Sequence, residues 1–333
     1  MLPTYDEVKQ SVAGAVEELE SLRKPIRAKR QMYNWLLLAT VVLAILLFLT
    51  APILLIPSVV IVVVMLILWY RNWSRGGSHY RAMFKQLVVV PLMQTMLERC
   101  SLPNETEEYE YYCKYSPDAR IDDRWIQKSR LYDIDIDEVH GEDLFRGRLG
   151  LTDFMFSELR LVQERRTTDS KGNTTTTRVD MFKGILFIAD FHKDFEGITI
   201  LDSNVGKGGF FGRMLGRLSS TSYTPPIKMM LEDEAFNEAF QVRTTDEIKA
   251  RYILSSSMME RILAFKRRHK EKISISFVDS FMCVSMWSSK NYFESKLSKP
   301  VTGAHLEAIY EDLKFLFGWI EAFNLNTRIW SKE

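Results

Sequence analysis

The first part of the fold is decided by residues 31–70, which read QMYNWLLLATVVLAILLFLTAPILLIPSVVIVVVMLILWY. This stretch carries no charged residue and is interrupted by Pro52 and Pro57. A single helix over its last 36 residues would be about 54 Å long, whereas the hydrocarbon core of a bilayer is about 30 Å thick. Two arms of about 18 residues with a turn at the prolines fit better. The sequence therefore predicts a transmembrane helical hairpin over residues 32–70.

Basic residues flank the hairpin on both sides, and the turn between its arms carries no charge. They are Arg23, Lys24, Arg27, Lys29 and Arg30 before it, and Arg71, Arg75, Arg81 and Lys85 after it. Since positive charge favours the cytoplasmic side, both ends of the hairpin are expected there. The alternative is a hairpin that enters and leaves the same leaflet, because each arm is only just long enough to span. Both versions keep the rest of the chain cytoplasmic.

Residues 1–31 are predicted to form an amphipathic helix. It opens with a capping-box pattern at Thr4 and Glu7. Its apolar residues recur every three or four positions, as Tyr5, Val8, Val12, Ala15, Leu19, Leu22 and Ile26. This seam fits the protein's own next helix, and the alternative is pairing with a second copy, which would make a homo-oligomer. Pro25 is expected to end or kink the helix.

A juxtamembrane helix is predicted in residues 71–105. Gly76 and Gly77 are expected to act as a flexible joint, and a helix with one apolar side follows from Ser78 to Arg99. Pro91 is expected to kink this helix. Because the hairpin returns the chain to the same membrane face, the two helices are expected to meet as a stalk.

The composition fits a cytoplasmic globular domain tied to a membrane. The chain has 333 residues and a formal net charge of +1, so no nucleic-acid partner is predicted. Its three cysteines, Cys100, Cys113 and Cys283, form no zinc-type or CxxC spacing, which indicates a reducing compartment. Residues 106–333 are long enough for a substantial core.

Short alternating segments in residues 106–333 predict an α+β class with a curved antiparallel sheet and packed helices. Strands are expected around 107–112, 144–152, 155–165, 179–190, 197–201, 227–231, 272–278 and 281–287. Helices are expected near 246–254, 256–269 and 303–323. Residues 166–177, rich in threonine, are interpreted as a polar hairpin loop.

Several motifs resemble a known family. They are Gly141-Glu142-Asp143, Phe156-Ser157-Glu158-Leu159, Phe182-Lys183-Gly184-Ile185-Leu186-Phe187, Asp190-Phe191-His192-Lys193, Leu231-Glu232-Asp233-Glu234-Ala235-Phe236 and Ala250-Arg251-Tyr252-Ile253-Leu254. As a string they resemble an uncharacterised family of bacterial two-pass membrane proteins, sometimes labelled galanin-like. The resemblance implies an inner-membrane protein without an assigned activity, often encoded near LemA-type membrane proteins, which are the partner class it implies. It carries over no catalytic residue.

Four charged residues in or beside these motifs are candidate ligand-binding groups around a cavity in the sheet. They are Glu158, Asp190, Lys193 and Arg251. The alternative is a structural role, in which Glu158 pairs with Lys183 or Arg160 and Arg251 pairs with Glu232 or Asp233.

Residues 206–217 interleave glycine, basic and large apolar residues. The candidate contacts with membrane or partner are Lys207, Phe210, Phe211, Arg213, Met214 and Arg217, since cations suit headgroups while apolar side chains insert. A nucleotide loop is disfavoured because the Lys-Ser or Lys-Thr ending is missing. The other alternative is an exposed loop without function.

The sequence contains no recognisable catalytic or metal motif. Asp133, Asp135 and Asp137 resemble the start of a calcium loop, but Glu138 and Leu144 stand where that loop needs glycine and glutamate. The five histidines lack ligand spacing, so no metal and no cofactor are predicted. The expected function is a membrane-tethered interaction or scaffold protein without enzymatic activity. The alternative is an enzyme or sensor that binds a lipid or another small ligand.

Overall fold

The computed structural model describes residues 2–50, 55–99, 112–132, 136–149, 152–168, 172, 174–191, 196–203, 226–269 and 271–323. It divides into two compact units. One comprises residues 3–96 and 292–312, and the other comprises residues 97–291 and 313–333 with the first two residues. Long helices dominate the smaller unit, and a sheet with helices makes up the larger one. The α+β class is therefore confirmed.

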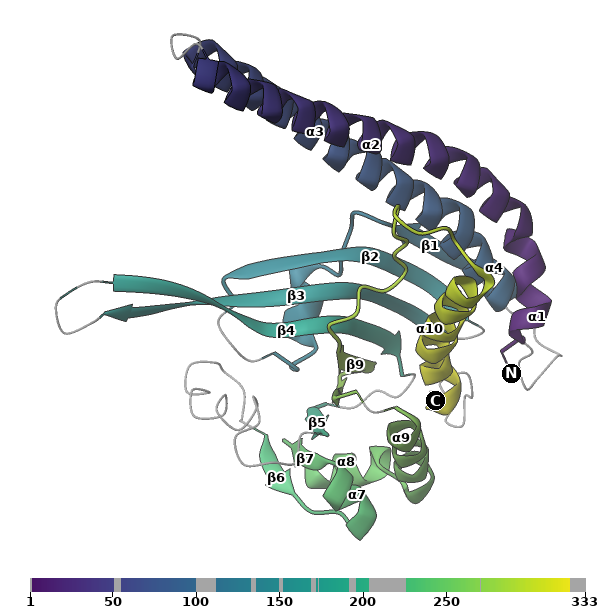
Figure 1. Ribbon diagram of the computed structural model, residues 1–333. Coiled ribbons are helices and arrows are strands. Elements are labelled where there is room, and N and C mark those ends of the chain that lie inside the picture. The colour runs from purple at the N-terminus through teal and green to yellow at the C-terminus, as the bar shows by residue number, and fades with distance from the viewer. Residues whose placement is uncertain are drawn as a thin grey trace. The chain divides into compact units, whose positions relative to one another are not determined.

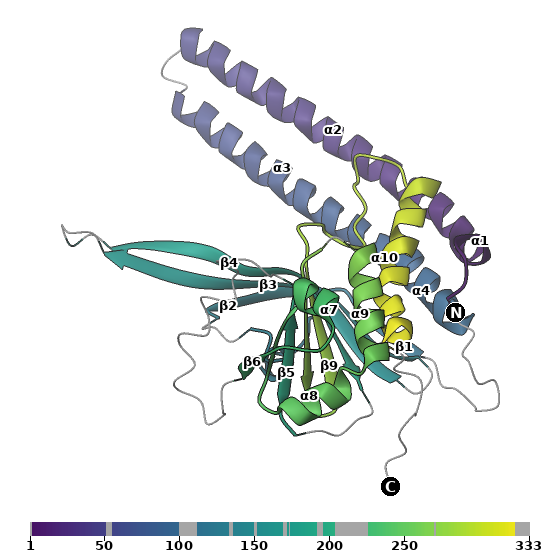
Figure 2. The ribbon, with the colours of Figure 1, turned by 90° about the horizontal axis from the view of Figure 1, so that it is seen from below.

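The smaller unit is built around two long antiparallel helices that lie side by side (Figures 1 and 2). Its elements are α1 (Tyr5–Val8), η1 (Lys9–Val12), α2 (Ala13–Thr50), α3 (Leu55–Phe84), the π-helical turn η3 (Lys85–Val89) and the start of α4 (Val90–Glu98). Two stretches of helix are long and apolar enough to cross a membrane, and they run within residues 5–50 and 56–98. The predicted pair of apolar helical arms is thus present.

The predicted helix end at Pro25 and the predicted joint at Gly76 and Gly77 are wrong, whereas a kink at Pro25 stays a prediction. Pro25 lies inside α2, which runs through it without ending. Contacts just before the proline support the helix there, since Arg23 donates to Glu20 and to the carbonyl oxygen of Leu297. Gly76 and Gly77 lie inside α3 and form no joint. They are places of close approach, because a Cβ on Gly76 would lie 2.9 Å from the Cγ2 of Ile26 on α2.

Pro91 lies at the start of α4, directly after the π-helical turn η3, and the predicted kink there stays a prediction. Proline offers no N–H to the preceding turn, and the backbone widens into π-helical hydrogen bonding. Lys85 in this turn is buried, and its Nζ lies 3.4 Å from a carboxylate oxygen of Glu294. Lys85 therefore belongs to an internal ion pair.

The N-terminal seam is buried by the chain itself. Val8, Val12 and Leu19 have no exposed surface. The ring of Tyr5 packs 5.6 Å from that of Tyr310, whose hydroxyl donates to the carbonyl oxygen of Pro3 at 2.6 Å. The start of this seam is therefore buried within the chain, against α10, while packing on the next helix and pairing with a second copy stay predictions.

The larger unit contains a nine-stranded antiparallel sheet in the order β1-β2-β3-β4-β9-β8-β5-β7-β6. The strands are β1 (Tyr112–Ser116), β2 (Glu138–Leu149), β3 (Thr152–Thr168), β4 (Thr174–Asp190), β5 (Ile198–Asp202), β6 (Ile227–Met229), β7 (Gln241–Thr244), β8 (Ile273–Val278) and β9 (Phe281–Trp287). The helices are α5 (Asp123–Lys128), α7 (Glu234–Ala239), α8 (Glu247–Ile253), α9 (Ser256–Arg268) and the end of α10 (Gly303–Ala322).

One face of the sheet packs against α9 and α10, which lie alongside each other (Figure 2). The contacts are mainly aromatic. Phe187 of β4 meets Trp319 of α10 at 5.0 Å between ring centroids, and Trp319 meets Phe265 of α9 at 5.9 Å. Edge-on aromatic pairs of this kind add to the free energy gained by burying their area. This layer is a filled core.

The opposite face is covered by α5 and the segment after it. Ile126 of α5, with Leu131 and Tyr132, joins the cluster that contains Phe182 and Leu186 of β4. A buried hydrogen bond attaches the segment after α5 to the sheet, since the hydroxyl of Ser276 on β8 donates to the carbonyl oxygen of Ser129. Side chains therefore cover both faces of β4.

The sequence missed three short elements, α5, α7 and β7, and misread one segment. The polar stretch 166–177 is mainly strand, because β3 and β4 continue pairing out to Thr168 and Thr174. β-Branched threonine favours extended backbone despite its polarity. The result is a two-stranded arm that projects from the sheet (Figure 1).

Gly184 offers a test of the central strand. Its φ is +154°, and a Cβ there would lie 1.9 Å from the carbonyl oxygen of Met286 on β9. Gly184→Ala is expected to lower the free energy of unfolding by about 3 kcal/mol, since rigid backbone has to move. Gly318→Ala in α10 is the control, because a Cβ there meets nothing within 4 Å. Chemical denaturation measures both, and equal stability of the two variants would contradict this register.

Candidate functional site

A groove opens in the larger unit where several strands end. The register pairs Ile198 at the start of β5 with Val278 at the end of β8, and Thr199 with Thr244 at the end of β7. α5 and Arg130 provide the opposite wall. We call this cavity of about 550 Å³ the α5 groove, lined by Arg124, Gln127, Lys128, Arg130, Gly197, Ile198, Thr245, Val278 and Asp279.

The lining of the α5 groove is basic. It carries three cations, Arg124, Lys128 and Arg130, against one carboxylate, that of Asp279. The Nζ of Lys128 lies 3.2 Å from an oxygen of Asp279, and Arg124 pairs at the same distance with Asp122, its helix cap. Such an arrangement favours an anion over a cation.

Lys128 is held in place by aromatic rings. Its Nζ lies 4.6 Å from the ring centroid of Phe281 and 5.4 Å from that of Trp125. The two rings themselves meet edge-on at 4.8 Å. Cation–π contacts fix the ammonium group at the groove without neutralising it.

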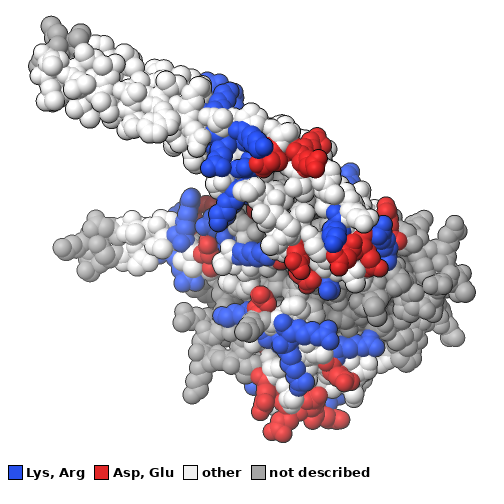
Figure 3. Space-filling view, turned by 45° about the vertical axis from the view of Figure 1, so that its right-hand side comes forward, with Lys and Arg blue, Asp and Glu red and all other residues white. Residues whose placement is uncertain are grey.

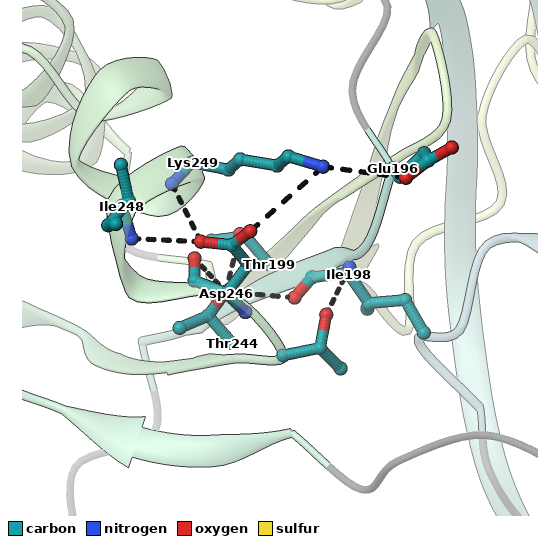
Figure 4. A network of polar contacts seen from close by, with 8 residues as sticks. Glu196, Ile198, Thr199, Thr244, Asp246, Ile248 and Lys249 are labelled. Carbon is teal, nitrogen blue, oxygen red and sulfur yellow. Dashed lines mark hydrogen bonds and ion pairs between the residues drawn. The ribbon is translucent and has the colours of Figure 1, made fainter.

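Polar contacts fix the strand-end wall of the groove (Figure 4). The hydroxyl of Thr245 accepts from the backbone N–H of Ile198 at 2.9 Å, and that of Thr244 donates to the carbonyl oxygen of Ile198 at 3.1 Å. Asp246 caps α8 by accepting from the N–H groups of Ile248 and Lys249. The start of β5 is therefore tied to the end of β7.

The candidate residues from the sequence do not converge. Glu158 lies opposite Ile185 in the β3–β4 ladder, while Asp190 lies opposite Phe281. Because side chains alternate along a strand, Glu158 and Asp190 point to opposite faces, about 17 Å apart along β4. Asp190 does lie at the sheet end that carries the β8–β9 turn, beside the α5 groove.

Arg251 has the structural role that was the alternative. It lies on α8, exposed, with its Nη1 3.9 Å from Glu232 and its Nη2 donating to the carbonyl oxygen of Met230. Arg160 pairs with Asp180 at 2.9 Å. Lys193 and the six candidate contacts in the 206–217 loop lie outside the described residues, as do Asp133 and Asp135.

The groove residues were missed because nothing in the sequence links them. The available signal was three cations within seven residues, Arg124 to Arg130, behind the helix-cap pattern of Asp122. Asp279, in the turn between two correctly predicted strands, was a second signal. Only the order of strands in the sheet brings the basic residues of α5 and Asp279 together.

The second candidate site is the surface of the α2–α3 hairpin. Its large apolar side chains are exposed, with Trp35 at 70% and Tyr70 at 65%. Lys and Arg residues gather at the base of this uncharged surface (Figure 3). There the guanidinium of Arg30 lies 4.1 Å from the ring centroid of Trp73, and the indole of Trp69 donates to Asn34 at 2.7 Å. The described residues leave this surface uncovered.

The described residues hold no group of three or more histidine, cysteine, aspartate or glutamate side chains that could bind a metal. The two described cysteines are also poor nucleophiles. Burial raises the pKa of the Cys283 thiol to about 12, and that of Cys113 likewise to about 12. Since the thiolate is the reactive form, neither thiol is primed for catalysis.

Part of the chain is similar to a known protein family. Residues 180–325 match the model of a family described as protein of unknown function (DUF3137). Over these residues the chain is therefore similar to an uncharacterised family, which confirms the resemblance at that level. The match begins in β4 and includes β5, β7, β8 and the turn with Asp279, but not α5.

Two further comparisons add no function. No curated protein matched the chain. The crystal structure of the mycobacterial trehalose monomycolate transport factor A, TtfA, is similar with a TM-score of 0.31 and 9% sequence identity. That match covers 66% of this chain and 91% of the other chain. At this TM-score the likeness carries no argument.

Thiol labelling tests the burial of Cys283. At pH 8 the folded protein is expected to leave this residue unmodified by a maleimide, because its raised pKa keeps it protonated and side chains cover it. Unfolding in guanidinium should expose it to complete modification. Peptide mass spectrometry locates the label, and rapid modification of Cys283 in the folded protein would contradict the placement of β9.

Proposed function

We propose that this protein is a membrane-tethered interaction or scaffold protein of the bacterial inner membrane, without enzymatic activity. The observation that carries the proposal is the hairpin of α2 and α3, whose uncharged arms expose their apolar side chains to the surroundings. From Gln31 to Thr50, α2 is about 30 Å long, which matches the hydrocarbon core. A soluble protein has no reason to leave this much apolar surface uncovered.

The orientation in this proposal follows from charge. Arg27, Lys29 and Arg30 precede the first arm, Arg71 and Arg75 follow the second, and all lie at the base of the hairpin. Positive charge on short flanks favours the cytoplasmic side, so the N-terminus and the main domain would face the cytoplasm. Trp35, Trp69 and Trp73 then lie at headgroup depth.

The β3–β4 arm supports an interaction role. Among the described residues, β2 pairs with β3 only as far as Val162, and β9 pairs with β4 only from Gly184. From Arg165 to Thr168 and from Thr174 to Thr177 the two strands pair with each other alone. Unpaired strand edges are available to extended segments of a partner. The family resemblance points to a LemA-type membrane protein as one such partner.

Cysteine scanning tests the topology. An impermeant maleimide is expected to label Thr50→Cys at the end of α2 from outside intact cells, but not Ser74→Cys beyond the second arm. The outer membrane is permeabilised beforehand, and unmodified protein with its native cysteines is the control. Labelling of Ser74→Cys alone would reverse the orientation. If neither is labelled until the inner membrane is opened, the hairpin re-enters without crossing.

Crosslinking in cells tests the interaction role. A photoreactive residue at Thr176 on the arm is expected to capture a specific membrane-associated protein, identified by mass spectrometry. The same residue at Glu260 on α9 is the matched control, because it is exposed but belongs to a helix whose backbone is already hydrogen-bonded. Further probes belong in residues 206–217. If no probe captures a protein above background, the scaffold proposal fails.

A further inference from the structure

We propose that the α5 groove binds a phosphate group, either free in solution or carried by a lipid headgroup. The groove belongs to the larger unit alone, so this site does not depend on the membrane tether. It would give the domain a ligand, and with it a sensing role that the scaffold proposal lacks.

Charge is the first argument for phosphate. Arg124, Lys128 and Arg130 outnumber Asp279 in the lining and Asp122, which pairs with Arg124 beside it, so positive charge is in excess here. Phosphate near neutral pH carries between one and two negative charges on a compact group. Planar guanidinium groups bind such oxygens in pairs, and ammonium groups act as point charges beside them.

The position of Lys128 is the second argument. Its side chain is 39% exposed, and its Nζ is supported by the rings of Phe281 and Trp125. A long side chain that is already ordered loses less entropy when it binds an anion. Arg124, by contrast, is 89% exposed and can close over a bound group from α5.

Asp279 is the third argument, because its carboxylate shows that Lys128 can pair with an anion in the groove, at 3.2 Å. It lies in the β8–β9 turn with a left-handed backbone, φ +54°, and its carboxylate is 61% exposed. A bound phosphate would pair with the ammonium group of Lys128 and displace the carboxylate of Asp279 from it. Asp279 would then act as a competing anion that weakens binding.

The groove also has room and neutral donors. Its volume of about 550 Å³ exceeds that of a bare phosphate, so the molecule that bears the phosphate can enter too. The amide of Gln127 lines it, and the Thr245 hydroxyl, which accepts from Ile198, retains a hydrogen to donate. The shared chemistry of the expected ligands is a phosphate monoester.

Calorimetry with inorganic phosphate tests the site. The full chain is placed in phosphatidylcholine nanodiscs at low ionic strength, where surface charges are least screened. Saturable binding is expected. Lys128→Gln and Arg124→Gln are each expected to weaken it about fivefold, whereas Asp279→Asn should strengthen it by about the same factor. Asparagine keeps the turn, because it tolerates the left-handed backbone.

The expected changes in phosphate affinity have opposite signs for Lys128→Gln and Asp279→Asn, so a general loss of structure cannot produce both. Arg178→Gln on the β3–β4 arm removes the same charge outside the groove and is expected to leave phosphate affinity unchanged. Thermal unfolding of each variant shows whether the fold is kept. The proposal is overturned if phosphate does not saturate, if Asp279→Asn weakens binding as Lys128→Gln does, or if Arg178→Gln has an equal effect.

Nanodiscs that contain phosphatidic acid distinguish the sources. If the lipid headgroup reaches the groove, the apparent affinity for inorganic phosphate falls in these discs, and Asp279→Asn enhances that competition. If the ligand is soluble, the affinity is the same in both kinds of disc. Either outcome supports the site and identifies whether its ligand is a lipid headgroup or a soluble phosphate. If phosphate binds in neither kind of nanodisc, the proposal is refuted.

Discussion

The larger unit depends on the burial of β4 on both faces. From Met181 to Ala189 every side chain of this strand except Lys183 is buried, so each face of the sheet needs its own cover. Strands β3 and β9 pair with its two edges, and Gly184 admits the backbone of β9. The aromatic layer of α9 and α10 closes one face. The other face holds α5, and with it the basic wall of the α5 groove.

In the larger unit, the residues that stabilise the sheet lie in its middle, and the residues of the candidate binding site lie at its strand ends. The middle of the sheet is filled on both sides, which leaves the strand ends as the place where polar groups can gather. There Thr244 and Thr245 tie the start of β5 to the end of β7. The same contacts give the groove a rigid wall, against which the more exposed Arg124 can move.

The helical unit obeys another constraint, because its hairpin exposes apolar surface that the chain does not cover. Where α2 and α3 pack within their own unit, tertiary contacts outweigh the local preference of proline and glycine to interrupt a helix. Pro25 costs a helix about 3 kcal/mol in isolation, yet the contacts of Arg23 and Ile26 hold the turns on either side of it. Gly76 allows the two helices to approach closely, because it has no side chain where Ile26 of α2 lies. Exposed and packed parts of one helix therefore follow different sequence patterns.

The sequence by itself determined the uncharged hairpin, its basic flanks and most strands and helices of the sheet domain, because hydrophobic length and periodicity are local properties. It misread threonine-rich strands as a loop and missed β7, whose four residues carry too little pattern. Only the tertiary structure decided the candidate site. Arg124, Ile198, Thr245 and Asp279 lie far apart in the chain, and they meet because β5 enters the sheet between β8 and β7. Strand order is set by long-range packing, which no local spacing records.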